Sequence, residues 1–351
     1  MNLALQRHAG YALLAAALFG ASTPLAKRLL GDLSPLMLAG LLYLGSGIGL
    51  AALRLIKSIS AKESESGDLH GKDYLWLTSA ILAGGVCAPV LLLWGLSGVS
   101  ASVASLLLNF EGALTTILAS LIFGEAVGKR VWWSVAIMLL AGSTLVYSPG
   151  AEIRELLPAA AVIAACLLWG LDNNLTRNIS GANAATIAMY KGIAAGCVNL
   201  TLAALAGATL PSAGNTIAAT LIGFFSYGLS LVLFIIALRH LGSARTSAHF
   251  GTVPFFGAAL SIILLNEPLT MGFAVGLMLM ILATWLVLTE THEHFHVHTP
   301  VTHEHPHRHD EHHDHAHSGQ EGAEPHSHVH THAPLAHSHA HLPDLHHRHR
   351  H

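Results

Sequence analysis

Long apolar runs separated by short polar breaks occupy residues 9–290 of this 351-residue chain. Most runs contain about 18–24 residues, which is the length an α-helix needs to cross the roughly 30 Å hydrocarbon layer of a bilayer. The pattern predicts ten membrane-spanning helices. Their approximate boundaries are 9–28, 35–56, 74–96, 100–122, 131–148, 157–178, 184–206, 216–238, 245–265 and 270–289.

Two elements of the first half recur in the second half. The first span contains Phe19-Gly-Ala-Ser-Thr-Pro-Leu-Ala-Lys27, and the sixth contains Trp169-Gly-Leu-Asp-Asn-Asn-Leu-Thr-Arg177. When the two segments are aligned, an aromatic residue, a glycine, a leucine and a basic residue occupy the same positions in both. Leu121-Ile-Phe-Gly-Glu125 likewise aligns with Ile263-Leu-Leu-Asn-Glu267. We therefore predict a duplication with repeats at 1–150 and 151–290. Because five spans per repeat is an odd number, the second repeat must enter the membrane from the opposite side, as in many secondary transporters.

The distribution of lysine and arginine indicates how the helices are oriented. With the N-terminus in the cytoplasm, ten bases fall on the cytoplasmic side and three on the other side, so the positive-inside rule favours two cytoplasmic termini. The ten are Arg7, Arg54, Lys57, Lys62, Lys72, Lys129, Arg130, Arg177, Arg239 and Arg245; the three are Lys27, Arg28 and Arg154. The first run precedes Lys27 and Arg28 and belongs to the repeat, so it is not expected to be a cleaved signal peptide.

Composition narrows the class of protein. Charged residues make up 11% of the chain and hydrophobic residues 52%, against about 25% charged in soluble proteins. We predict an integral protein of the inner or plasma membrane with lipid as a partner and no nucleic acid. Cys87, Cys166 and Cys197 lie in apolar runs and form no CxxC, so no disulfide framework is expected. The spans contain no HExxH or GxSxG and the chain no Walker phosphate loop, so we expect neither an enzyme nor an ATP-driven pump.

Several polar and ionisable residues fall inside the predicted spans. An unpaired charge at the bilayer midplane costs about 2.5–3.5 kcal/mol, so Glu111, Asp172 and Lys191 must pair, become neutral or face water. Two readings of Glu111 stay open: a proton or substrate site that titrates during transport, or a structural ion pair with Lys191. The candidate cavity residues are Ser22, Thr23, Asn109, Glu111, Thr115, Asp172, Asn173, Lys191 and His249.

Each of the other candidates also has a second, structural interpretation. Asp172 and Asn173 are predicted to line a cavity or to hold helices together by hydrogen bonds. Lys191 is a counter-ion for one of the carboxylates or a snorkelling lysine. His249 aligns with Leu107 when Glu267 is laid on Glu125, close to the level of Glu111, and is a cavity residue or an ordinary interior histidine.

Prolines and glycines within the spans predict irregular or closely packed helices. Pro24, Pro89 and Pro254 each remove a helix hydrogen bond and can kink or break the helix. Broken helices at matching positions of two repeats indicate a transporter's binding site. Small faces for close helix packing are predicted at Gly45-x3-Gly49, Gly192-x3-Gly196 and Gly272-x3-Gly276.

From His292 the composition changes abruptly. Of the 27 histidines, all but His8, His70, His240 and His249 lie in this tail, mostly as His-x-His runs, with five prolines and few large apolar residues. We predict a disordered cytoplasmic tail, 291–351, that binds Zn²⁺, Ni²⁺, Co²⁺ or Cu²⁺ through neutral imidazoles. The candidate metal ligands are His303, His305, His307, His309, His312, His313, His315, His317, His326, His328, His330 and His332.

The paired elements and the ten spans resemble the drug/metabolite transporter superfamily, EamA type, over about residues 9–290. The resemblance implies a secondary transporter, often an exporter of small metabolites, with a central cavity lined mainly by spans 1, 3, 4, 6, 8 and 9. It also implies that Glu125 and Glu267 cap span ends. Asn109-Phe-Glu111 departs from the aromatic or proline that such proteins often have in the middle of span four, and the tail is not part of the family pattern.

The sequence therefore predicts an all-α membrane protein of ten helices in two inverted five-helix repeats, with a disordered tail. The expected function is secondary active transport of a small solute, as an exporter and with proton coupling, and no cofactor is required. The alternatives are a divalent metal (Zn, Ni or Co) transporter, or a membrane metal sensor or buffer that transports nothing. A homodimer is compatible with the sequence.

Overall fold

A computed structural model gives the arrangement of the chain. It describes residues 3–58, 71, 73–123, 129–146, 153–179, 183–241, 246, 249–289, 293–298, 301–307, 326–332 and 335–340. The chain divides into two units, a helical unit, Met1–Glu290, and a C-terminal unit, Thr291–Arg348.

Each predicted span coincides with helix in the described residues. The first half contains α1 (Leu3–Gly20), α2 (Ser22–Leu29), α3 (Pro35–Ser58), α4 (Asp73–Ala80), η1 (Ile81–Cys87), α5 (Ala88–Gly98), α6 (Ala101–Leu107), α7 (Phe110–Phe123) and α8 (Lys129–Val146). The second half contains α9 (Ile153–Arg177), α10 (Ala184–Leu205), α11 (Ala213–Gly223), η2 (Phe224–Leu229), α12 (Ser230–Leu241), α14 (Val253–Leu265) and α15 (Met271–Leu288). The elements η1 and η2 are π-helical segments within longer helices.

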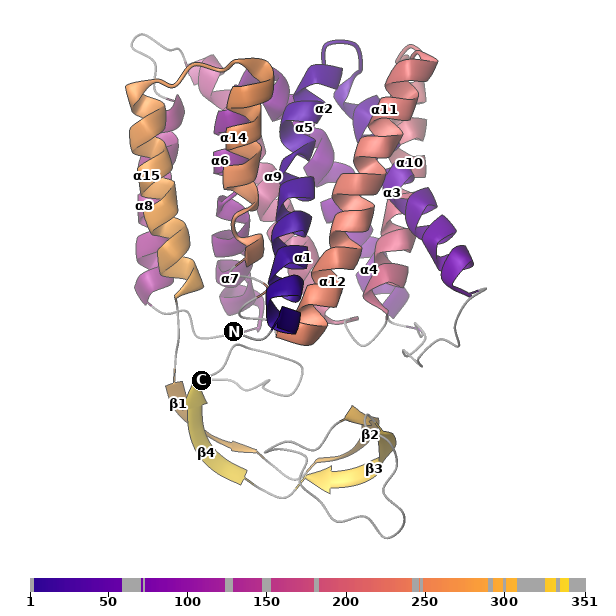
Figure 1. The fold of residues 1–351 in the computed structure, drawn as a ribbon, viewed down its shortest axis with the longest axis vertical. Helices are drawn as coiled ribbons and strands as arrows, with labels where there is room; N and C mark the ends of the chain where they lie inside the picture. The colour runs from indigo at the N-terminus through magenta and orange to yellow at the C-terminus, as the bar shows by residue number, and fades with distance from the viewer. Residues whose placement is uncertain are drawn as a thin grey trace. The chain divides into compact units, whose positions relative to one another are not determined.

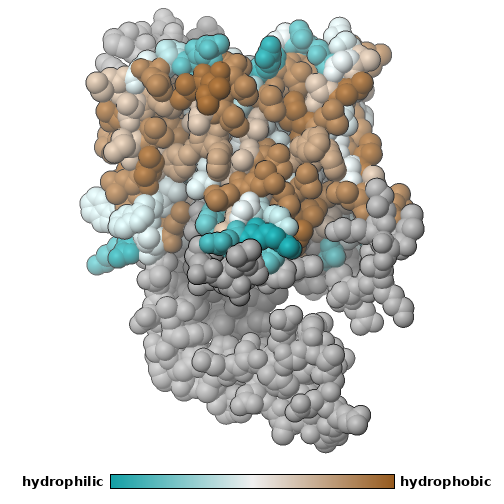
Figure 2. Space-filling model, in the orientation of Figure 1, coloured by the Kyte–Doolittle hydropathy of each residue, from teal (hydrophilic) through white to brown (hydrophobic). Residues whose placement is uncertain are grey.

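The helices are suited to a bilayer. Eight helical stretches in the described residues are long and apolar enough to cross a membrane, among them Gln6–Leu29 and Ala213–Ala237. The other two predicted spans correspond to α14, a shorter apolar helix, and to α8, which has 18 residues. Figure 2 shows a mostly hydrophobic band across the visible face of the helical unit, with more hydrophilic residues above and below it. The helical fold agrees with the prediction, whereas the count of ten spans stays a prediction.

The two halves pack on each other in a reciprocal way. Helix α1 of the first span contacts α12 of the eighth, just as α5 of the third span contacts α9 of the sixth. Likewise α1 contacts α14, and α9 contacts α7. The second and seventh spans, α3 and α10, pack together, as do α8 and α15 (Figure 1). This exchange of partners is what an inverted repeat produces.

Glycine lets several helix pairs approach closely. A Cβ at Gly192 would lie 2.7 Å from the backbone nitrogen of Gly47, so α10 and α3 meet backbone to backbone. The other glycines of the predicted pairs also lie in close contacts, with backbone for Gly45 (Thr220), Gly196 (Leu44) and Gly272 (Thr144), and with side chains for Gly49 (Phe224) and Gly276 (Leu145). Small residues thus provide the helix contacts that van der Waals packing in a membrane requires.

The π-helical segments occupy matching places in the two halves. When Glu267 is laid on Glu125, Ile81–Cys87 falls on residues 223–229, and η2 is Phe224–Leu229. A π-helical turn inserts one extra residue into an α-helix and often occurs at functional sites. The third and eighth spans therefore carry the same irregularity in both repeats.

Four strands lie in the described residues of the C-terminal unit, and the disorder expected for 291–351 as a whole stays a prediction. β1 (Glu293–His298) pairs antiparallel with β4 (Leu335–Ala340), and β2 (Val301–His307) pairs antiparallel with β3 (His326–His332) (Figure 1). The alternation of histidine with other residues has a period of two, which fits extended backbone.

Candidate functional site

Two side-chain donors of the candidate site meet at the backbone carbonyl of Gly84 in η1. Pro89 follows five residues later and has no N–H, so the π-helical hydrogen bond that would satisfy Gly84 cannot form. Instead the Tyr43 hydroxyl donates to the Gly84 oxygen at 2.8 Å and the Trp169 indole Nε1 donates at 2.9 Å. The next carbonyl, Gly85, accepts from Asn199 Nδ2 at 3.0 Å. The proline predicted to disturb the third span thus turns two backbone carbonyls toward side-chain donors.

Asp172 packs directly against Gly84 and pairs with Lys191. Lys191 Nζ lies 2.5 Å from Asp172 Oδ1 and 2.6 Å from Oδ2, with the two side chains only 17% and 8% exposed. Thr176 donates to Oδ1 at 3.0 Å. A Cβ on Gly84 would clash with the Asp172 carboxylate, so glycine is required there. The pair joins α9 to α10, and Asp172 is the carboxylate that Lys191 neutralises.

Glu111 lies at the break between α6 and α7. The hydrogen bonds Asn109 N to Leu106 O and Glu111 N to Leu108 O span three residues instead of four, and such tight turns inside a helix often mark a hinge or strain. Asn173 Nδ2 donates to Glu111 Oε1 at 3.1 Å and also lies 3.3 Å from Thr115 Oγ1. Within the described residues no base forms a salt bridge with Glu111. The proposed structural ion pair of Glu111 with Lys191 is therefore absent from this arrangement.

The predicted residues Glu111, Thr115, Asp172, Asn173 and Lys191 thus form two adjacent clusters on α7, α9 and α10. Asp172 belongs to one cluster and Asn173 to the other. Successive helical residues are about 100° apart, so Asp172 faces α10 and Asn173 faces α7. Asn173 is exposed and Glu111 is partly exposed, whereas Asp172 is buried. In one cluster the carboxylate is neutralised by a lysine, and in the other the Glu111 carboxyl accepts a hydrogen bond from a neutral amide.

Aromatic side chains beside this network were not singled out from the sequence. Tyr43 stacks on Tyr227 with ring centroids 5.7 Å apart, and Phe19 meets Tyr227 edge-on at 5.2 Å. Phe19 and Trp169 are the aligned aromatics of the two repeats, so the repeat alignment could have indicated them. Tyr43 and Tyr227 carried no such signal, because an isolated tyrosine in an apolar span is common.

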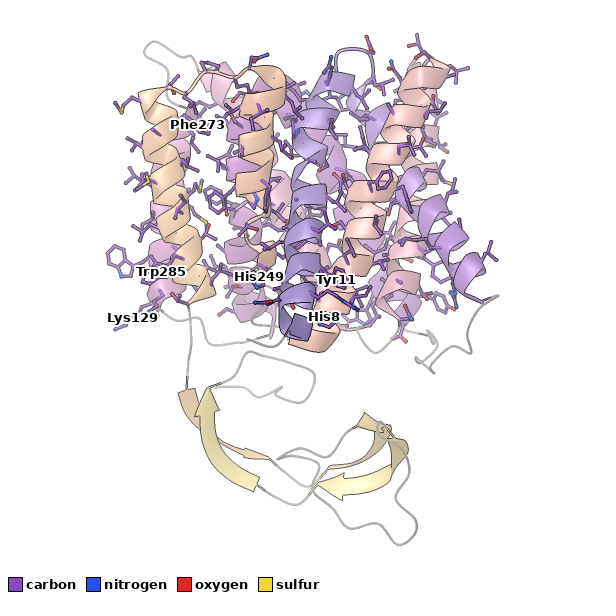
Figure 3. The ribbon with its side chains drawn as sticks, viewed as in Figure 1. His8, Tyr11, Lys129, His249, Phe273 and Trp285 are labelled. Carbon is purple, nitrogen blue, oxygen red and sulfur yellow. The ribbon has the colours of Figure 1, made fainter. Side chains whose placement is uncertain are left out.

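The other predicted cavity residues lie apart from the two clusters. Asn109 is buried and accepts a 2.8 Å hydrogen bond from Thr284 of α15. Ser22 and Thr23 are buried at the start of α2, and Ser22 Oγ donates to the Phe19 carbonyl at 2.7 Å. His249 is partly buried just before α14, and its backbone carbonyl accepts from Thr252 N at 3.2 Å (Figure 3). The assignment of these four residues to a cavity stays a prediction.

The span ends carry charged caps. Glu267 accepts from the backbone N–H groups of Ala101 and Ser102 at 2.6 and 2.9 Å, at the N-terminus of α6, where a negative charge is stabilised. Lys27 donates to the Leu96 and Val99 carbonyls that end α5 and follow it. Glu267 therefore has the structural role that the resemblance implied, and Glu125 lies outside the described residues.

Metal ligands do not cluster in what the structure describes: no group of three or more His, Cys, Asp or Glu residues there could hold an ion. Of the predicted tail ligands, seven lie in described strands, and five lie outside the described residues. The seven are His303, His305, His307, His326, His328, His330 and His332; the five are His309, His312, His313, His315 and His317.

Comparison with known proteins decides the family. The model of the EamA-like transporter family matches residues 7–148 and again residues 156–289, most of the chain. The protein belongs to the EamA-like transporter family. It is accordingly an integral membrane protein of transporter type, and membership implies a non-enzymatic role. The resemblance seen in the sequence is confirmed.

Two further similarities were found. An "Uncharacterized transporter" from Methanothermobacter thermautotrophicus is 29% identical over 265 residues, which is 71% of this chain and 77% of that protein. A solved crystal structure shares the fold with a TM-score of 0.58 at 14% identity, covering 80% of this chain and 98% of the other. That structure supports the fold alone.

Proposed function

We propose that this EamA-like protein is a secondary active transporter that exports a small polar metabolite by alternating access, with Glu111 as the group that couples transport to protons. The observation that carries the proposal is the contrast between the two carboxyls. Asp172 is buried and neutralised by Lys191, whereas Glu111 is partly exposed and hydrogen-bonded to the Asn173 amide.

This arrangement suits a group that changes its protonation state. A neutral amide can accompany either form of a carboxyl, since its NH₂ donates to the ionised form and its oxygen accepts from the protonated form. The Thr115 hydroxyl beside Asn173 gives a further polar group for a solute. The break at Leu108–Asn109 and the two π-helical segments supply backbone irregularities in the third, fourth and eighth spans, which alternating access can use.

We also propose an orientation in which both ends of the helical unit face the cytoplasm of an inner or plasma membrane. The helical unit begins and ends at one edge, and Lys129 lies at that edge too (Figures 1 and 3). With Arg7, Arg54 and Arg130 counted on the same side, the positive-inside rule supports our proposal that both ends of the helical unit are cytoplasmic.

The test compares small-solute efflux from cells that express wild-type protein, Glu111→Gln or Asp32→Asn, by mass spectrometry of the medium. Asp32 is an exposed carboxylate between α2 and α3 and serves as a control with the same loss of charge. We expect a defined metabolite to accumulate outside with wild type and Asp32→Asn, and to fall to background with Glu111→Gln. Equal efflux from all three would overturn the role of Glu111.

The runner-up, divalent metal transport, rests on the histidine-rich tail together with Glu111, Asp172, Asn173 and His249. Asp172 is engaged by Lys191 rather than open to an ion, which favours the organic solute. Flux of Zn²⁺, Ni²⁺ and Co²⁺ in proteoliposomes under a pH gradient distinguishes metal transport from transport of an organic solute. Metal flux that Glu111→Gln abolishes would establish metal transport and overturn our proposal.

A further inference from the structure

Three of the six tryptophans of the chain lie near one end of the packed helix pair α8 and α15. Trp132 and Trp133 follow the start of α8 by one turn, and Trp285 precedes the end of α15 by one turn. They are 54%, 67% and 57% exposed. An indole has an apolar body and a polar N–H group, so tryptophan is enriched where hydrocarbon meets lipid headgroups. This end of the helix pair therefore suits the level of the headgroups.

Two exposed bases accompany these tryptophans. Lys129 lies three and four residues before the tryptophans of α8, so it shares their face of the helix. Arg130 Nη1 donates to the Thr289 carbonyl at 2.9 Å, across the contact between α8 and α15. Thr289 in turn donates through its hydroxyl to the Trp285 carbonyl at 2.7 Å. Figure 3 shows Lys129 and Trp285 at the same edge of the helical unit. The α8–α15 patch consists of Lys129, Arg130, Trp132, Trp133 and Trp285.

The bases and tryptophans of α8 have no counterpart in the second repeat. When Glu267 is laid on Glu125, positions 129, 130, 132 and 133 fall on Met271, Gly272, Ala274 and Val275 of α15. None of these four residues is basic or aromatic. The start of α15 lies at the opposite edge of the helical unit, as the positions of Phe273 and Lys129 in Figure 3 show. The repeated fold therefore does not require the patch, and a partner at one face of the membrane accounts for it.

Exposed apolar side chains continue from the patch toward the middle of both helices. They lie three to seven residues from the tryptophans of their own helix, which is one to two turns, and they are 44–68% exposed. These residues are Leu139 and Leu140 of α8 and Met278, Ile281 and Leu282 of α15. Polar donors at the helix ends and an apolar surface beside them match the two parts of a phospholipid.

We propose that the α8–α15 patch binds an anionic phospholipid, with Lys129 and Arg130 on the phosphate of its headgroup and its acyl chains along the apolar surface. Charge-assisted hydrogen bonds from lysine and arginine to phosphate are strong. In the part of the chain that the structure describes, neither base forms a salt bridge, so the patch carries positive charge that favours an anionic over a zwitterionic lipid. The proposal goes beyond transport and does not depend on it.

The test uses full-length protein in phosphatidylcholine vesicles that contain rising fractions of dibrominated phosphatidylglycerol or dibrominated phosphatidylcholine. Bromine quenches tryptophan fluorescence on contact, so quenching reports lipid beside exposed tryptophans. K129Q/R130Q removes both charges of the patch, and K129R/R130K keeps them. The control, R7Q/R54Q, removes two exposed bases near the start of α1 and the end of α3, at the same edge of the helical unit (Figure 1).

Each base near an anionic surface strengthens binding about fivefold. Wild type, K129R/R130K and R7Q/R54Q should therefore reach half-maximal quenching at a phosphatidylglycerol fraction roughly 10–25-fold below that of phosphatidylcholine. K129Q/R130Q should lose this preference, and W132F/W133F/W285F should lose the quenching that distinguishes the two lipids.

Three results would overturn the proposal. The first is equal quenching of the wild type by the two lipids, or the same loss of preference in R7Q/R54Q as in K129Q/R130Q. The second is displacement of the brominated phosphatidylglycerol by dissolved glycerol phosphate, which would assign the patch to a soluble anion. The third is a dimer that excludes the brominated lipid, which would assign the patch to a second copy of the chain.

Discussion

The Asp172–Lys191 pair permits a quantitative test of the site's packing. Replacing Lys191 by Met leaves a carboxylate buried against Gly84 without a counter-ion, and replacing Asp172 by Asn leaves the ammonium likewise. Breaking a buried pair by removing one partner costs about 3–5 kcal/mol. The shift per kcal/mol is roughly 2–4 °C for 150–250 residues and smaller for a longer chain, so each single variant should lower Tm by roughly several degrees.

The double variant D172N/K191M should recover most of that loss, because neither charge then remains buried and unpaired. Asparagine keeps the shape of Asp172 and an oxygen that can accept from Thr176. Thermal unfolding of the purified proteins in detergent, followed by tryptophan fluorescence, measures the cycle. A double variant that loses as much Tm as the two singles added together would show that the pair contributes no coupling, and the reasoning would be refuted.

Two further predictions concern single positions. Gly84→Ala should destabilise the protein by about 1–3 kcal/mol through overpacking against Asp172, measured as a Tm shift, whereas Gly112→Ala, in open space on α7, should be neutral or slightly stabilising. Glu267→Ala should cost about 0.5–2 kcal/mol by removing the carboxylate that caps α6. An unchanged Tm for Glu267→Ala would show that solvent or neighbouring groups replace the cap.

Apolar run length and the paired elements were enough to predict the helices and the repeat. The sequence also indicated that Glu111, Asp172 and Lys191 would need partners, but it left open which carboxylate the lysine meets. That choice depends on the rotation of α9, which turns Asp172 toward α10 and Asn173 toward α7. The rotation of α9 about its axis is set by how the helices pack. The close contacts at Gly84 and Gly192 join residues far apart in the sequence, so the sequence does not reveal them.

The carbonyl acceptors of Gly84 and Gly85 could not be predicted, because a glycine pair in an apolar span carries no polar signal. Pro89 gave the relevant hint, since it predicts carbonyls without their usual partners. In the tail the His-x-His period is compatible with extended backbone, but only the structure gives the pairing of β2 with β3.

The most direct test of the central claim is the pH dependence of solute flux in proteoliposomes, once the exported metabolite is known. Wild type and Asp32→Asn should move the solute faster when protons flow down their gradient in the direction opposite to the solute. Adding solute should then change the pH of the vesicle lumen. Glu111→Gln should lose both the pH dependence and the proton movement. If Glu111→Gln transports with the same pH dependence as wild type, Glu111 is not the coupling group and the account is contradicted.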